Sequence, residues 1–179
     1  MKKLSYVAFV ILLAVMFTTQ GFAQEALKPR PSPMSVATLK NGDTYVKVTY
    51  GRPHKKQREV FGKLVQYGKV WRTGANEATE ITTTEDIKFG ENTLKAGTYT
   101  LFTVPNEDKW TIVINKDLGQ WGAYRHNPDN DLFKFDVPVK SVDTAYEAFT
   151  IEFEDNKASK TNLNMIWDKT KVSIPVEVL

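Results

Sequence analysis

The sequence predicts an all-β protein, an antiparallel β-sandwich of jelly-roll type with about ten strands. Three observations lead to this prediction. Apolar and polar residues alternate with a period of two over most of the chain, turn residues interrupt the alternation at short intervals, and no segment carries a sustained helical stripe. A sheet with one face on a core and the other in water produces this alternation.

The alternation is clearest in four segments. Their apolar positions are Val46, Val48 and Tyr50; Phe133, Phe135, Val137 and Val139; Phe149, Ile151 and Phe153; and Val172, Ile174, Val176 and Val178. Residues 98–104 and 110–115 are apolar on both faces, which predicts a central place in the sheet. Turn signals lie at 40–43, 89–92, 95–97 and 105–108.

Three other features refine the strand assignment. Pro138 and Pro175 cannot donate a ladder hydrogen bond, so we expect both at edge strands or bulges. Residues 58–65 are compatible with a turn or two of helix, limited by Gly62. Trp71 ends a strand-like run and is expected in the core.

The amino terminus predicts export. Lys2 and Lys3 precede an apolar run over 4–17 and a small-residue cleavage site, so residues 1–23 are interpreted as a signal peptide. A membrane span takes about twenty apolar residues, and we therefore expect no stable anchor after cleavage. Residues 24–33 form a proline-rich extended leader, and 34–179 a single domain. The expected location is periplasmic or secreted.

Composition excludes several classes of chemistry. The chain has no cysteine, so disulfides, thiolate metal sites and a cysteine nucleophile are ruled out. Residues 52–72 carry a net charge of +6, and the rest of the mature chain is acidic. This segment is either a solvated loop or a surface that attracts an anionic partner. A nearly neutral exported domain with one basic loop is not expected to bind nucleic acid.

Two stretches break the strand rhythm, residues 51–78 and 116–130. The first contains RTGANEAT (72–79), in which Arg72, Asn76 and Glu77 can converge. They form either a polar brace for a buried turn or a clamp for a carboxylate or phosphate, and Arg52 in GRP is expected to face the same way.

The second stretch contains Trp121 and Tyr124. Exposed aromatic rings on a β-sheet loop commonly stack on a sugar, whereas a buried Trp121 would plug the end of the domain. Asn115, at the end of a central strand, is compatible with either arrangement. The two stretches are expected to meet at one end of the β-scaffold.

Catalytic and metal signals are weak. His54 and His126 lie far apart, no HExxH or GxSxG motif is present, and no metal or cofactor is expected. The two carboxylates of a glycosidase must lie close together in space, and their spacing along the sequence does not show whether they do. Glu77 is the first carboxylate to test in that role.

Four segments resemble a known family: TYGRP (49–53), FGKLVQYGKVWRTGANEAT (61–79), LKAGTYTLFTVP (94–105) and WTIVINKDLGQWGAY (110–124). They are similar to a family of secreted bacterial proteins, many from Bacteroidetes, catalogued as domain of unknown function 2911. The resemblance spans roughly residues 33–178 and implies an exported β-rich domain without an established activity. Gln66 stands where the family usually has proline.

Three hypotheses follow for function. The first is a non-catalytic exported domain that binds a sugar or a small anionic molecule where the two irregular stretches meet. The second is a glycan-directed hydrolase that uses Glu77 as acid or base. The third is a structural or assembly module of the cell envelope.

Overall fold

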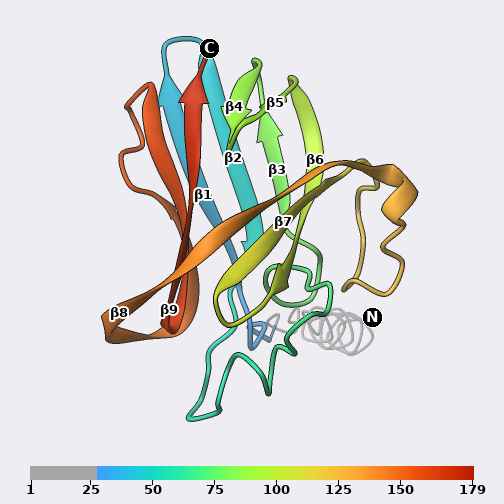
Figure 1. Ribbon diagram of the computed structural model, residues 1–179, viewed down its shortest axis with the longest axis vertical. Coiled ribbons are helices and arrows are strands. Elements are labelled where there is room, and N and C mark those ends of the chain that lie inside the picture. The colour runs from blue at the N-terminus through green and yellow to red at the C-terminus, as the bar shows by residue number, and fades with distance from the viewer. Residues whose placement is uncertain (1–27) are drawn as a thin grey trace, which may run out of the picture.

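The computed structural model describes residues 28–179, so the predicted signal peptide and the first residues of the leader lie outside the described part. The described chain forms nine β-strands and one short 3₁₀ helix, Pro128–Asn130 (Figure 1). The strands are β1 (Met34–Asn41), β2 (Thr44–Gly51), β3 (Glu80–Thr83), β4 (Ile87–Phe89), β5 (Asn92–Leu94), β6 (Gly97–Pro105), β7 (Lys109–Asn115), β8 (Asp131–Phe153) and β9 (Lys160–Val178). No described residue belongs to a helix long and apolar enough to span a bilayer.

The strands form one antiparallel sheet in the order β1-β2-β3-β6-β7-β8-β9-β4-β5. The all-β class and the antiparallel pairing are thus confirmed, and β6 and β7 lie inside the sheet as predicted. The predicted β-sandwich of jelly-roll type is not shown. Hydrogen bonding joins all nine strands into one sheet, and this sheet is not closed.

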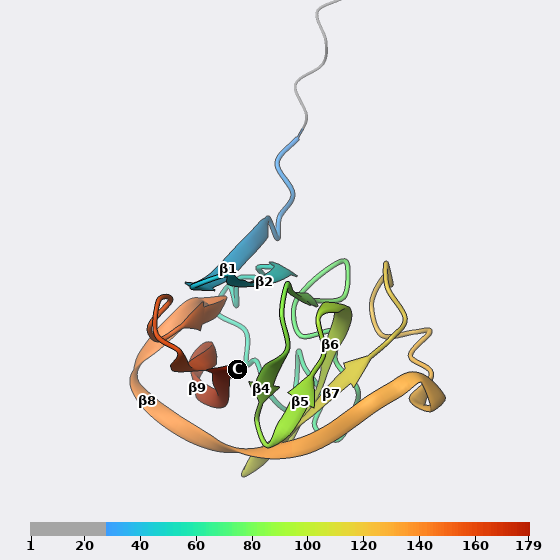
Figure 2. The same ribbon diagram turned by 90° about the horizontal axis from the view of Figure 1, so that it is seen from above.

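Strand β8 is responsible for the curvature of this sheet. Its first part pairs with β7 over Asp131–Pro138, and its second part pairs with β9 over Val139–Phe153. The register shifts twice, between Ser141 and Tyr146 and between Tyr146 and Thr150. Extra residues of this kind bend a strand. Figure 2 shows β8 sweeping in a wide arc around the other strands.

Strand β9 folds back on itself. Asp168, near its midpoint, has a φ of 52°. Val178 N donates to Ser159 O at 2.7 Å, and Ser173 Oγ donates to Asn164 Oδ1 at 2.7 Å. The two halves of β9 therefore lie side by side. An aspartate is one of the few side chains that adopts this left-handed conformation readily.

Both prolines lie where a strand exchanges one partner for another. Pro138 is the last β8 residue paired with β7, and Val139 is the first paired with β9. In β9, pairing with β8 ends at Val172 and pairing with β4 begins at Val176, so Pro175 falls between them. The expectation of an edge strand was wrong, since β8 and β9 are interior strands. Proline is tolerated at positions 138 and 175 for the reason expected, because no backbone N–H is needed for the ladder where the strand changes partner.

The core lies inside the curved sheet and is rich in aromatic rings. Trp71, Trp110, Trp167, Phe61 and Phe149 contact one another with ring centroids 5.0–6.2 Å apart. Trp71 is buried, as predicted. Residues 58–65, which deliver Phe61 to this cluster, form turns without a helix, closed by Val65 N donating to Val60 O at 2.8 Å.

A second, smaller apolar cluster lies on the opposite face of β6 and β7. It is formed by Ala78, Phe102 and Val113, which are covered by Val70 and Ala123 from the two irregular stretches. Neighbouring residues on a strand point to opposite faces, so Leu101 enters the main core while Phe102 supports the loops. This cluster positions the candidate site.

Candidate functional site

The RTGANEAT turn is built against the end of β2 by backbone contacts. Ala75 N donates to Gly51 O at 3.2 Å, and Trp71 Nε1 donates to Gly74 O at 3.1 Å. A Cβ on residue 51 would overlap the carbonyl oxygen of Ala75 and lie 2.9 Å from its carbon. Glycine is therefore required in TYGRP because the RTGANEAT backbone passes directly over it.

The two irregular stretches lie side by side. Glu77 and Trp121 form an isolated antiparallel bridge, and Ala78 N donates to Gln120 O at 2.8 Å. Gly122 N donates to Asn76 O at 2.9 Å, so each stretch holds the backbone of the other. This spatial meeting, which the site hypothesis requires, is confirmed.

Arg72 and Glu77 do not form the brace that was one of the two interpretations of this turn. Both oxygens of Glu77 contact Nη1 of Arg30, at 2.7 and 3.0 Å. The hydrogen bonds from Arg30 and from the backbone of Glu77 itself hold the pKa of this carboxyl below its ordinary value. The Nε of Arg72 is buried without a hydrogen-bond partner among the described residues.

The side chain of Asn76 bonds to the leader and not to Arg72. Its φ is 64°, and its Nδ2 donates to Ser32 O at 3.2 Å. Together with the Arg30–Glu77 pair, this bond fixes residues 30–33 against the turn. The leader was predicted as an extended segment that precedes the domain, and the single arginine in KPRPSP gave no sequence signal of its docking.

Arg52 faces another part of the molecule. Its backbone N donates to Pro33 O at 2.8 Å, and its Nη2 lies 3.3 Å from Thr150 Oγ1 on β8. The neighbouring Lys55 forms an ion pair with Asp168, and Arg58 donates to the carbonyl oxygen of His54 at 2.7 Å. Several side chains of the basic segment 52–72 thus bond this segment to β8, to β9 and to its own backbone.

Asn115 is fully buried and organises the base of the second stretch. Its Nδ2 donates to Asn127 O at 2.9 Å and to Asp131 Oδ1 at 2.8 Å, while its Oδ1 accepts from Asp117 N at 2.8 Å. These bonds close residues 116–130 into a fixed loop. Both the amide nitrogen and the amide oxygen of Asn115 are thus bonded inside the protein, at the base of the second stretch.

Asp131 joins the same network from the start of β8. His126 Nε2 lies 2.9 Å from its Oδ1, and Lys134 Nζ lies 3.0 Å from its Oδ2. Burial by itself raises the pKa of this carboxyl, but the hydrogen bonds from Asn115, Lys134 and His126 outweigh burial and hold the pKa below its ordinary value.

Trp121 and Tyr124 line an open hollow on the outside of the second stretch. Trp121 is 61% exposed and Tyr124 is 84% exposed. The hollow has a volume of about 560 Å³, and Asp117, Leu118 and Arg125 complete its polar and apolar walls. Neither Arg52 nor Arg72 lines it.

The ring of Tyr124 lies against a glycine. Gly122 has a φ of 72°, and a Cβ there would lie 2.6 Å from the Cε2 atom of Tyr124. One edge of the ring thus lies against the backbone of residue 122, while most of the side chain is exposed.

A second hollow of about 210 Å³ adjoins the first and shares Gly119 and Gln120 with it. Glu77, Glu80 and Met34 line it. Glu80 Oε1 accepts a hydrogen bond from Gly119 N at 2.9 Å. Glu80 was missed as a residue of this region, because nothing in its sequence context distinguishes it from an ordinary strand end.

The histidines do not come together. His54 bridges to Ala148, whereas His126 contacts Asp131 and the ring of Phe102. Over residues 28–179, no group of three or more histidine, aspartate or glutamate side chains is arranged to hold a metal ion.

A model of the family described as "Protein of unknown function (DUF2911)" matches residues 32–176. The chain belongs to this family. No curated protein and no solved structure matches the chain.

Proposed function

We propose that the protein is an exported, non-catalytic binding domain whose ligand is a carbohydrate, held in the hollow lined by Trp121 and Tyr124. The observation that carries the proposal is the exposure of these two rings on a loop that is otherwise tightly fixed. Large aromatic side chains left in water on a rigid support are typical of a binding surface.

The chemistry of the hollow suits a sugar. The apolar C–H face of a pyranose stacks on an aromatic ring, and its hydroxyls take hydrogen bonds from polar side chains at the rim. Arg125 supplies donors, and Asp117 with the backbone of residues 118–120 supplies acceptors. The loop is preorganised by Asn115 and Gly122, which reduces the conformational entropy lost on binding.

The state of Glu77 argues against the role of glycosidase acid, whereas the role of base, which needs an ionised carboxylate, is left to the hydrolysis assay below. A glycosidase acid must hold a proton near neutral pH, which requires a raised pKa. The pKa of Glu77 is lowered and its carboxylate is paired with Arg30. Glu77 is therefore ionised and already bonded when the neighbouring hollow is empty.

The test is calorimetry against a panel of neutral and acidic oligosaccharides. Trp121→Ala and Tyr124→Ala are each expected to weaken binding about tenfold or more, since stacked aromatic contacts at binding sites contribute on the order of 1–3 kcal/mol. Tyr45→Ala is the matched control, because Tyr45 is an exposed aromatic residue on β2, outside the hollow.

Two outcomes would count against the proposal. Binding that survives both loop variants would place the ligand elsewhere. Release of reducing ends by the wild type, abolished in Glu77→Gln, would make the protein a hydrolase. Export is tested separately by sequencing the amino terminus of the protein recovered from the periplasm or medium, which is expected to begin at Gln24.

A further inference from the structure

A third hollow lies where β8 leaves β9 and β4 takes its place. Pairing of β8 with β9 ends at Val139 and Val172, and pairing of β4 with β9 begins at Phe89 and Val176. The gap between these ladders opens into a hollow of about 490 Å³. It shares no residue with the two hollows beside Trp121.

One part of the wall of this hollow is apolar. Phe135, Val137, Pro138 and Pro175 line it. The ring of Phe135 rests on Gly90, where an added Cβ would lie 2.7 Å from ring atom Cε2, so glycine leaves room for the ring. Phe135 also contacts Phe89, with ring centroids 5.9 Å apart. The ring is thus fixed from two sides.

Two lysines face each other at the rim. Lys140 and Lys171 are direct cross-strand partners in the β8–β9 ladder, and both line the hollow. Side chains that are directly opposite share a face of the sheet, and like charges there repel and destabilise the pair. Neither lysine forms an ion pair with any residue of the described chain.

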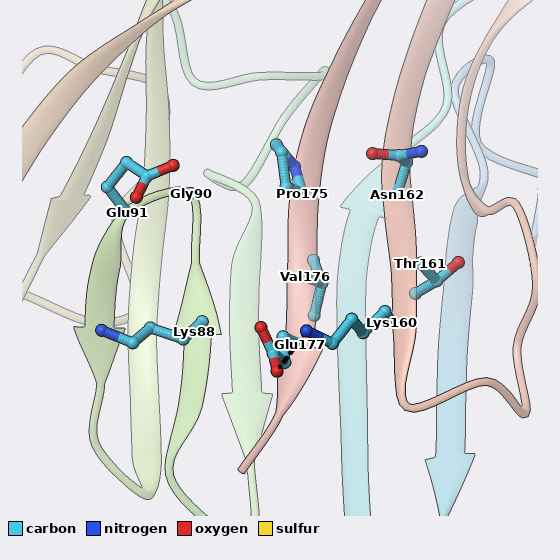
Figure 3. A pocket seen from close by; sticks show the side chains of 9 residues that line it. All are labelled: Lys88, Gly90, Glu91, Lys160, Thr161, Asn162, Pro175, Val176 and Glu177. Atoms are coloured by element: carbon cyan, nitrogen blue, oxygen red, sulfur yellow. Dashed lines mark ion pairs between the residues drawn. The ribbon is translucent and has the colours of Figure 1, made fainter.

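The adjoining surface contains a lysine that is paired. In Figure 3, Lys160 points toward Glu177 and is joined to it by an ion pair of 2.8 Å. Lys88, the direct cross-strand partner of Glu177, points its ammonium group away from that carboxylate. Lys160 is thus bonded to an acid, in contrast to Lys140 and Lys171.

Three acids also line the third hollow, and none of them forms an ion pair with Lys140 or Lys171. Asp136 is bonded to Lys109 at 2.7 Å and to Thr111 at 2.6 Å. Glu154 accepts from Asn162 Nδ2 at 2.7 Å, a bond that leaves its negative charge in place. Glu91 lies on the turn between β4 and β5, where it is exposed and its charge is screened by water.

We infer that this hollow binds a small organic oxyanion, in which a carboxylate or phosphate group lies between Lys140 and Lys171 and an apolar body packs against Phe135, Val137 and Pro138. Lysine is a flexible point charge without the planar fork of arginine, so the two ammonium groups select for negative charge rather than for one head-group shape. The inference does not depend on the carbohydrate proposal.

The test uses three anions and one neutral compound at low ionic strength. Phenyl phosphate and phenylacetate carry both parts of the expected ligand, inorganic phosphate carries the head alone, and benzyl alcohol carries the ring alone. We expect the wild type to bind at least one of the two aromatic anions, with an affinity that falls as salt is added. Which of them binds better identifies the preferred head group.

Lys140→Gln and Lys171→Gln are each expected to weaken that binding about tenfold, because a hydrogen bond to a charged group is lost. In the empty protein, the same substitutions are expected to raise the melting temperature by about 1–3 °C, since they remove a like-charge repulsion. Lys160→Gln is the control: it breaks the pair with Glu177 and should leave anion binding unchanged.

Three binding results would overturn the inference. In the first, the wild-type protein binds neither aromatic anion. In the second, inorganic phosphate or benzyl alcohol binds as tightly as the aromatic anions, and in the third, Lys160→Gln weakens binding as much as Lys171→Gln does. A fall in melting temperature of the empty Lys140→Gln and Lys171→Gln proteins would show that the two lysines stabilise the fold, and it would contradict the repulsion on which the inference rests.

Discussion

Arg30 and Glu77 join the proline-rich leader to the turn that forms one wall of the candidate site. Nη1 of Arg30 contacts both carboxylate oxygens, and Asn76 and Arg52 bond the carbonyl groups of Ser32 and Pro33. Residues 30–33 are therefore part of the domain.

Arg30→Ala is expected to raise the pKa of Glu77 toward its ordinary value, because the hydrogen bond that lowers it most is removed. The pair is largely exposed, so the stability change should stay below about 1 kcal/mol. NMR titration of the Glu77 side chain and thermal unfolding measure the two effects. Lys95→Ala, which breaks an exposed pair with Asp86, is the control and should leave the pKa of Glu77 unchanged. An unaltered Glu77 titration in Arg30→Ala would contradict the contact.

Gly51→Ala is expected to destabilise the fold strongly. The new methyl group would meet the backbone of Ala75, which cannot move without displacing the whole turn. Overpacking of this kind costs about 1–3 kcal/mol or more, a fall in melting temperature of roughly 4–10 °C. Gly119→Ala is the comparison, since a Cβ there meets nothing within 4 Å and only the positive φ of 65° opposes it. Equal losses in both variants would show that the close approach at Gly51, which has no positive φ, costs no more than the backbone strain at Gly119.

Asp131 is expected to make the stability of the fold sensitive to low pH. Its pKa is lower in the folded protein than the ordinary value of 3.8, so its contribution to stability is complete above that value and is lost as pH falls through the folded pKa. Thermal unfolding between pH 2 and 6 should therefore show a smaller acid decline in Asp131→Asn than in the wild type. At neutral pH the variant should be less stable by about 3 kcal/mol, because Asp131 is a buried ion-pair partner. An unchanged slope in the acid range would assign the decline to other carboxylates.

Gly122→Ala is expected to weaken ligand binding at the Trp121–Tyr124 hollow without removing either ring. The added methyl group would displace the Tyr124 ring. Its φ of 72° adds about 1–2 kcal/mol of backbone strain, so a modest fall in melting temperature should accompany the loss. Calorimetry with the ligand found for the wild type makes the comparison. Gly42→Ala, at a distant turn with a similar positive φ and free space, should lose stability without losing affinity.

The strands were predictable from the sequence because the period-two pattern reports which face of a strand is buried. That pattern placed the centre of the sheet at residues 98–104 and 110–115, and it assigned Val137 and Val172 to the inner face. It does not report which strands pair with each other. The exchange of partners at Pro138 and Pro175 therefore could not be predicted, and with it the single curved sheet in place of two separate ones.

The candidate site was predictable only in outline. The irregular composition of residues 51–78 and 116–130 indicated where the strands are interrupted, and these two stretches do meet. The partner of Glu77 could not be predicted, because Arg30 lies in a leader with no periodic pattern, and local spacing favoured Arg72. The burial of Asn115 depends on hydrogen bonds to Asn127 and Asp131, whose backbone and side-chain positions are set by the 3₁₀ turn between them.

The fold-back of β9 also determines when the domain can form during synthesis. The last residues of the chain complete the ladder with β4, and Ile174 and Val176 fill the inner face beside rings contributed by the first half of the molecule. Before these residues are in place, the core cluster that contains Trp71 and Trp110 lacks the side chains of Ile174 and Val176. Sheets built from such distant segments fold slowly.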